Sequence, residues 1–171
     1  MNKIELVNLK LKTFTEQDAE DYCLINNINP LDITRLDFQF NQLTDISGIK
    51  LFKNLEILYL LDNNITDISI LKYLKNLRIL NISDNKINDI NILKDLKKLI
   101  KLTINNNKIT DISVIKYLIE LEGLYMANLR LKPDQVQYIN KCKNLKELYC
   151  YKGFKNMSVL NNLNKDINIT K

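Results

Sequence analysis

The chain of 171 residues contains no histidine. Histidine is the base of Ser-His-Asp and Cys-His catalysis and a frequent nitrogen ligand of protein-bound metals, so the sequence excludes these kinds of site. Its three glycines, Gly48, Gly123 and Gly153, stand alone, and none belongs to a loop that could cradle a phosphate group. We therefore expect no enzyme, no cofactor and no metal centre.

Cysteine and long apolar runs are also scarce. Cys23, Cys142 and Cys150 are odd in number and form no CxxC pair, which argues against a disulfide framework or a zinc ribbon. No N-terminal apolar run resembles a signal peptide, and no segment has the length of a membrane span. These features predict reduced thiols in a cytoplasmic protein that makes no contact with a membrane.

What the sequence does contain is a repeat with a period of 22 residues and no gap. Four copies begin at Ile33, Leu55, Leu77 and Leu99, the second of which reads LEILYLLDNNITDISILKYLKN. The first, fourth and sixth positions of each copy are apolar, and only a short strand places the fourth and sixth on one side. Such a period indicates stacked units that bury their apolar faces against one another.

Two polar residues recur in the same register. Asparagine occupies the ninth position, where the chain leaves the strand, and its amide can bond the turns of its own and neighbouring units. These residues form the predicted asparagine ladder: Asn41, Asn63, Asn85 and Asn107. Aspartate occupies the thirteenth position, before an apolar run, and is predicted to cap a short helical turn; these residues are Asp45, Asp67, Asp89 and Asp111.

The pattern LxxLxLxxNxIxDIxxLxxLxN resembles that of leucine-rich repeat proteins with 22-residue units, a class shared by bacterial internalins and a regulatory subunit of protein phosphatase-1. The ITDIS motif at 65–69 and 109–113 resembles the internalin form most. The resemblance covers residues 33–120 closely and 121–163 loosely. It implies an α/β solenoid, a right-handed superhelix with a parallel β-sheet on the concave side and short helical or irregular segments on the convex side.

Both ends of the chain depart from the repeat. Residues 1–32 predict an N-terminal cap made of a strand and a helix that begins at Thr15, although the helix could instead be a separate binding element. Residues 33–171 predict an array of about six units, of which the last two are degenerate and form a C-terminal cap. Leu129 and Gly153 replace the ladder asparagine in those two units.

Side chains between the core positions of each strand are expected to point away from the core, on the concave face. Two apolar clusters appear among them, and we predict that they bind a protein partner. The clusters are Phe40, Ile57, Tyr59, Leu61 and Ile79, and Tyr125, Tyr149 and Tyr151. The alternative is that these residues only favour a strand and pack against one another.

The expected function is therefore a non-enzymatic protein-protein interaction module with an adaptor or regulatory role, acting as a monomer or a weak homodimer. The alternative is polyanion or nucleic-acid binding, because the net charge is +5 and lysines recur on the predicted convex face, for example at Lys50, Lys72, Lys94 and Lys116. A solvated back surface explains those lysines more simply, since the aromatic residues are expected on the opposite face. A nucleic-acid partner is accordingly disfavoured.

Overall fold

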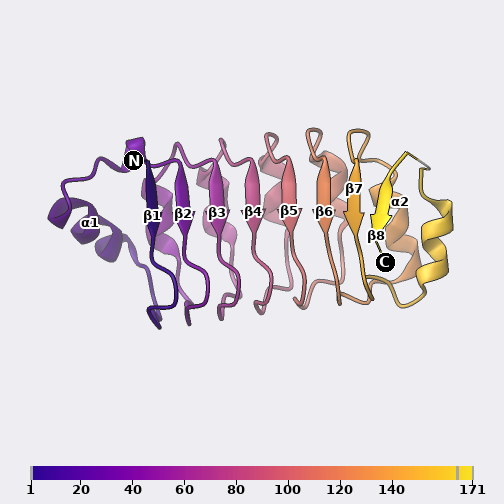
Figure 1. Cartoon of the computed structure of the whole chain (residues 1–171), viewed down its shortest axis with the longest axis horizontal. Helices are drawn as coiled ribbons and strands as arrows, with labels where there is room; N and C mark the ends of the chain where they lie inside the picture. Colours follow the sequence, from indigo (N-terminus) through magenta and orange to yellow (C-terminus); the bar gives the residue numbers. More distant parts are fainter. Residues whose placement is uncertain (1, 165, 171) are drawn as a thin grey trace.

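The computed structural model describes residues 2–164 and 166–170 and forms a single open sheet (Figure 1). Eight parallel strands lie side by side in the order of the sequence. Each strand has three residues: β1 Lys3–Glu5, β2 Arg35–Asp37, β3 Ile57–Tyr59, β4 Ile79–Asn81, β5 Lys101–Thr103, β6 Gly123–Tyr125, β7 Glu147–Tyr149 and β8 Asn168–Thr170. The predicted solenoid is confirmed, with one strand more at each end than the six units supply.

Short helices cover one side of the sheet and leave the other side open (Figure 1). The elements that connect consecutive strands are η1 Pro30–Asp32, η2 Ser47–Leu51, η3 Ser69–Tyr73, η4 Asn91–Asp95, η5 Ser113–Tyr117, η6 Pro133–Gln135, α2 Val136–Ile139 and η7 Met157–Asn162. We call the open side the sheet face. We call the opposite side, formed by residues 47–54, 69–76, 91–98, 113–120 and 136–144, the helical face.

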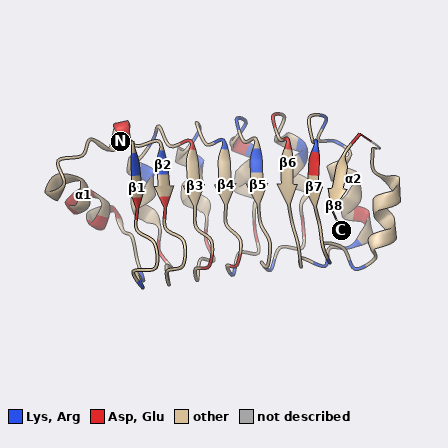
Figure 2. Ribbon diagram, viewed as in Figure 1, with Lys and Arg blue, Asp and Glu red and all other residues tan. Residues whose placement is uncertain are grey.

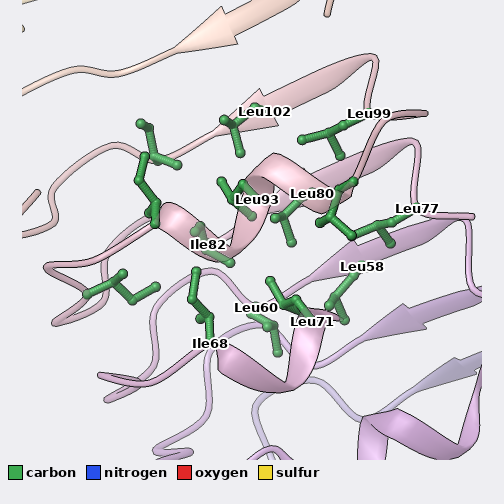
Figure 3. Packing of buried hydrophobic residues seen from close by; sticks show 14 of the residues in the cluster. Leu58, Leu60, Ile68, Leu71, Leu77, Leu80, Ile82, Leu93, Leu99 and Leu102 are labelled. Carbon is green, nitrogen blue, oxygen red and sulfur yellow. The ribbon is translucent and has the colours of Figure 1, made fainter. Parts of the chain in front are cut away.

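The core lies between the sheet and the helices and repeats with the sequence. Leu58, Leu80 and Leu102 are register partners on β3, β4 and β5, and they follow one another as a row in Figure 3. All three are fully buried, as are Leu71 and Leu93 on the helical side of the core. Since burying one such side chain contributes roughly 1.5–3 kcal/mol, each unit is stabilised mainly by its neighbours.

The asparagine ladder has the predicted geometry. The Nδ2 of Asn63 donates to the carbonyl oxygens of Phe38 at 2.9 Å and Leu60 at 3.1 Å, and its Oδ1 accepts the N–H of Leu43 at 3.0 Å. Each ladder asparagine therefore bonds its own turn and the turn of the preceding unit. Asn41 extends the pattern into the N-terminal cap, where its Oδ1 accepts the N–H groups of Leu9 and Leu11.

The thirteenth-position aspartates lie one residue earlier than a helix N-cap. The Oδ1 of Asp67 accepts the N–H of Ser69 at 2.7 Å, and the same bond recurs in the other three copies. The residue between them, Ile68, is the N-cap by backbone conformation and makes no side-chain capping bond. The prediction that these aspartates cap the helices is therefore wrong by one residue: each aspartate instead holds the turn that precedes a short helix.

The N-terminal cap covers the first unit. Helix α1 spans Glu16–Ile25, begins at a capping box between Thr15 and Asp18, and ends before Pro30. The segment before α1 packs onto η2, where the N–H of Gly48 donates to the carbonyl oxygen of Phe14 at 2.8 Å. A Cβ atom on Gly48 would lie 2.2 Å from the Thr15 carbonyl oxygen. Later units have Ile70, Ile92 and Val114 at this position.

Candidate partner-binding surface on the sheet

The sheet face is built from the third and fifth positions of each unit. Because the strands pair in register, the side chains at each position form a row across the sheet. The third-position row is Arg35, Ile57, Ile79, Lys101, Gly123 and Glu147, and the fifth-position row is Asp37, Tyr59, Asn81, Thr103, Tyr125 and Tyr149.

The first cluster lies over β3 and β4. Ile57 and Ile79 are register partners, and both are partly exposed. Tyr59 lies beside them under the guanidinium group of Arg35, which is 4.6 Å from the centre of the tyrosine ring. Arg35 is held in turn by Asp37, with 3.1 Å between Nη2 and Oδ2. The ring of Tyr59 is thus held on one side by Arg35.

Phe40 lies outside the strands, in the turn that follows β2. Its φ angle is 57°, in the left-handed region, and its side chain is 46% exposed. The next four units have the same backbone conformation at this position but fill it with Asp62, Asp84, Asn106 and Asn128, residue types that tolerate it well. The sixth unit has Lys152 there, at a φ angle of 49°. A large apolar residue is therefore held in a strained conformation at the rim of the sheet face.

The second cluster lies over β6 and β7, where Tyr125 and Tyr149 are register partners. The Tyr125 hydroxyl donates a hydrogen bond to Oε2 of Glu147. The ammonium group of Lys101 lies 5.2 Å from the centre of the same ring. Hydrogen bonding with Tyr125 and the nearby charge of Glu147 raise the pKa of Lys101, so the lysine is cationic at neutral pH. Tyr151 follows β7 in a turn and is 46% exposed.

A shallow depression of about 390 Å³ occupies the upper part of the sheet face. Its lining includes the apolar residues Ile57 and Ile79 and the charged residues Lys101 and Glu147. Gly123 is buried, because side-chain atoms of Tyr125 and Lys101 lie over it. The neighbouring strands β5 and β7 carry a blue and a red segment on either side of β6 in Figure 2. The depression therefore offers apolar surface bordered by charge of both signs.

The eight residues predicted from sequence all lie on this side of the molecule or at its rim, but they do not form one patch. Asn81 and Thr103 separate Tyr59 from Tyr125 in the fifth-position row. Three strand spacings of about 4.8 Å place the two tyrosines roughly 14 Å apart. The depression follows the third-position row from Ile57 to Glu147, so it extends from the first cluster to the second.

The sequence pattern did not reveal the polar residues that hold the tyrosines. Arg35, Lys101 and Glu147 appear in the third-position row, but their types alone do not show which ring each would contact. The sequence does contain a signal for these contacts. Arg35 and Lys101 each precede their tyrosine by 24 residues, so each cation occupies the third position of the preceding unit while the tyrosine occupies the fifth position of its own. These contacts also mean that the rings pack against side chains of neighbouring strands. Such packing is consistent with the alternative that the cluster residues only favour a strand and cover one another.

No helix in the described part of the chain has both the length and the apolar character of a membrane span. Within residues 2–164 and 166–170, cysteines and acidic residues form no group of three or more that could hold a metal ion.

Comparison with known proteins identifies the repeat. A family profile described as leucine-rich repeats in two copies matches residues 32–73 and 75–117. Among solved structures, an internalin from Listeria monocytogenes, InlF, is 32% identical with a TM-score of 0.74, over 81% of this chain and 41% of the internalin. The chain therefore spans less than half the length of that protein.

Two more distant structures share the fold. Internalin C2 of the same bacterium is 22% identical with a TM-score of 0.71, over 99% of this chain and 80% of the internalin. A leucine-rich repeat protein of Leptospira interrogans is 22% identical with a TM-score of 0.76, over 100% of this chain and 49% of its own length. Among curated protein sequences, none matches the chain.

Proposed function

The chain is a leucine-rich repeat protein, and on that basis we propose that its sheet face binds a protein partner through the two aromatic clusters and the depression between them. Proteins built from these repeats generally act in protein-protein interactions. The proposed role is that of a non-enzymatic adaptor or regulator in the cytoplasm. The rigid sheet presents its side chains in a preformed arrangement, which lowers the entropy lost on binding.

The observation that carries the proposal is the exposed ring of Phe40 at a positive φ angle. Strained residues persist where the surrounding structure holds them, and they concentrate at functional sites. Four successive units fill the same backbone position with aspartate or asparagine. Phe40 departs from this pattern and keeps a large apolar ring 46% exposed, which supports a role for the ring in binding.

The energetics of the surface are sufficient for a specific complex. Burying one large apolar side chain contributes roughly 1.5–3 kcal/mol. Phe40, Tyr59 and Tyr149 could together supply most of the roughly 8 kcal/mol that corresponds to a micromolar dissociation constant. Tyr59 and Tyr125 are already held by Arg35 and Lys101, so little rotamer entropy remains to be lost when a partner packs on them.

The test is affinity capture from a lysate of the source cells with three forms of the protein. Wild type is compared with a Tyr59→Glu/Tyr149→Glu variant, which places two charges on the sheet face. The matched control is Tyr73→Glu/Tyr117→Glu, which makes the same changes at two exposed tyrosines on the helical face. Circular dichroism establishes that all three forms fold.

We expect a protein that is captured by wild type and by the helical-face control but lost with the sheet-face variant. The dissociation constant for that protein should rise about 100-fold in the sheet-face variant, as is typical when two central contacts are removed. Capture that is equal for the two variants would contradict the proposal.

A further inference from the structure

The helical face is strongly basic. Its five segments hold ten lysines and two acidic residues, Asp95 and Glu120, which gives them a formal charge of +8. The whole chain carries +5, so everything outside these segments carries −3. Part of this separation is visible in Figure 2, where α1 bears red segments and no blue. The charge of the molecule is thus concentrated on one surface.

Most of these lysines have no acidic partner. Among the described residues, two of the ten form ion pairs: Lys50 with Glu16 at 2.6 Å and Lys75 with Asp95 at 3.5 Å. Lys72, Lys94 and Lys116 are exposed and recur at the same position of successive units. Their ammonium groups are therefore available to an anion across η3, η4 and η5.

Tyrosines lie between the lysines, which corrects the expectation that the exposed aromatic residues lie only on the opposite surface. Tyr73 is 48% exposed and Tyr117 is 46% exposed. The ammonium groups of Lys116 and Lys97 lie 4.9 and 5.3 Å from the centre of the Tyr117 ring, and that of Lys72 lies 5.0 Å from the Tyr73 ring. Long, flexible lysine side chains lie against these rings, so a lysine that moves to a phosphate group would expose more of the ring face.

We propose that the helical face binds a single strand of RNA or DNA, with its lysines on the phosphates and with Tyr73 and Tyr117 stacked on bases. Sequence-tolerant binding of single strands combines a positive track for the backbone with aromatic rings for the bases. Lysines that recur once in every 22-residue unit form a row of positive charges, which suits a ligand that carries a row of phosphate groups. The site is separate from the sheet face and does not depend on the protein partner proposed there.

An anionic membrane is the principal competitor for such a surface. Peripheral membrane binding usually combines basic residues with apolar side chains that enter the lipid. Within the described helical face, Ile119 is the one large aliphatic side chain that is exposed. The two tyrosines lie between lysines and are better placed for stacking, so the observations favour a nucleic-acid strand.

The experiment measures fluorescence anisotropy of labelled oligo(dT) and oligo(rU) of about 15 nucleotides, with the full chain titrated between about 50 and 200 mM salt. The charge variant is Lys94→Glu/Lys116→Glu. Its matched control is Lys86→Glu/Lys108→Glu, which alters exposed lysines that are also one unit apart but lie in the turns after β4 and β5. The stacking variant is Tyr73→Ala/Tyr117→Ala.

We expect the charge variant to bind at least tenfold more weakly than the control. For the charge variant, the slope of log Kd against log salt concentration should be smaller than that of wild type by about 1.4, because two phosphate contacts are lost. The stacking variant should also bind at least tenfold more weakly while keeping the wild-type salt dependence. The Tyr59→Glu/Tyr149→Glu variant should bind the oligonucleotides nearly as well as wild type, which separates this site from the sheet face.

Three results would overturn the proposal. Equal losses in the charge variant and its control would show that net charge alone drives binding. Unchanged affinity in the stacking variant would remove the role of the tyrosines. Sedimentation of the protein with phosphatidylserine-containing vesicles, without binding to either oligonucleotide, would assign the surface to a membrane.

Discussion

The side-chain amide of Asn85 reaches back across one unit to the carbonyl oxygen of Leu60, with 2.8 Å between Nδ2 and the oxygen. Its Oδ1 accepts the N–H of Ile65 at 3.0 Å. Both bonds are buried, so the groups they join have no access to water. One side chain thus supplies the polar partners for the turn of the preceding unit.

Replacing Asn85 with alanine should destabilise the protein by about 3 kcal/mol, because the buried N–H of Ile65 loses its acceptor and the carbonyl oxygen of Leu60 keeps only the bond from Asn63. For a chain of this size the melting temperature should fall by roughly 6–12 °C. Thermal unfolding followed by circular dichroism measures the change. Asn88→Ala, an exposed asparagine in the same unit, should melt close to wild type, and similar losses in both variants would contradict the ladder's role.

Gly48 and Gly123 should respond differently to alanine. At Gly48 the new Cβ would lie 2.2 Å from a backbone oxygen that belongs to the docked N-terminal cap, so the cap must shift at a cost of roughly 1–3 kcal/mol. At Gly123 the nearest atoms are side-chain atoms of Tyr125 and Lys101, at 3.2 and 3.3 Å, which can move. Hydrogen exchange should therefore show weaker protection of α1 in Gly48→Ala and near-normal protection in Gly123→Ala. Equal protection of α1 in the two variants would contradict this account.

Phe40→Asn should raise stability and weaken binding. Asparagine tolerates the left-handed conformation that Phe40 adopts at φ 57°, so the free energy of unfolding should rise by about 1 kcal/mol. Urea denaturation measures this change, and capture of the partner measures the loss of the ring. Phe40→Ala removes the ring without that relief, so it should weaken binding with no gain in stability. An asparagine variant that is less stable than wild type would rule out strain at this position.

The capping box of α1 should make stability depend on pH in the acid range. Hydrogen bonds from the backbone and side chain of Thr15 lower the pKa of Asp18 below its model-compound value of 3.8. Since the folded pKa is the lower one, the stabilisation is complete above pH 3.8 and is lost as the pH falls through the folded value. In Thr15→Ala, NMR titration of the Asp18 carboxyl should give a higher pKa than in wild type. An unchanged value would show that the box does not form.

The cysteines should resist thiol reagents in the folded protein. Cys23, Cys142 and Cys150 are buried, and burial raises the pKa of Cys142 to about 12. The thiolate, which is the reactive form, is therefore rare at pH 8. Ellman's reagent should react slowly with native protein and rapidly with all three thiols in denaturant. Fast reaction of any one thiol at low denaturant would indicate that its end of the array opens locally.

The sequence predicts those parts of the fold in which the same residue type has the same structural role in every unit. Asn63 and Asn85 have the same partners one unit apart, so their recurrence alone revealed the ladder. The ends lack this redundancy. Strand β8, whose Ile169 pairs with Leu148, follows no repeat consensus and was not predicted, because its place depends on the exposed edge of β7.

The candidate site was predictable only in outline. Alternation places Tyr59 and Tyr125 on the sheet face, but it does not show that Arg35 and Lys101 would lie over their rings. Those contacts depend on side-chain rotamers across neighbouring strands. Tyr117 was missed for a related reason: it follows Lys116 on a short 3-10 helix and its ring turns outward, while the adjacent Leu118 enters the core.

The hydrogen bonds between strands run along the long axis of the molecule, since the strands lie across it (Figure 1). A force that pulls the two ends apart is therefore carried through all the strand pairs in series, so the pairs should separate one at a time. Each of the four regular units should unfold separately and release 22 residues, or about 75 Å of chain. Under tension, these four units should therefore lengthen the chain in steps of equal size, one unit at a time.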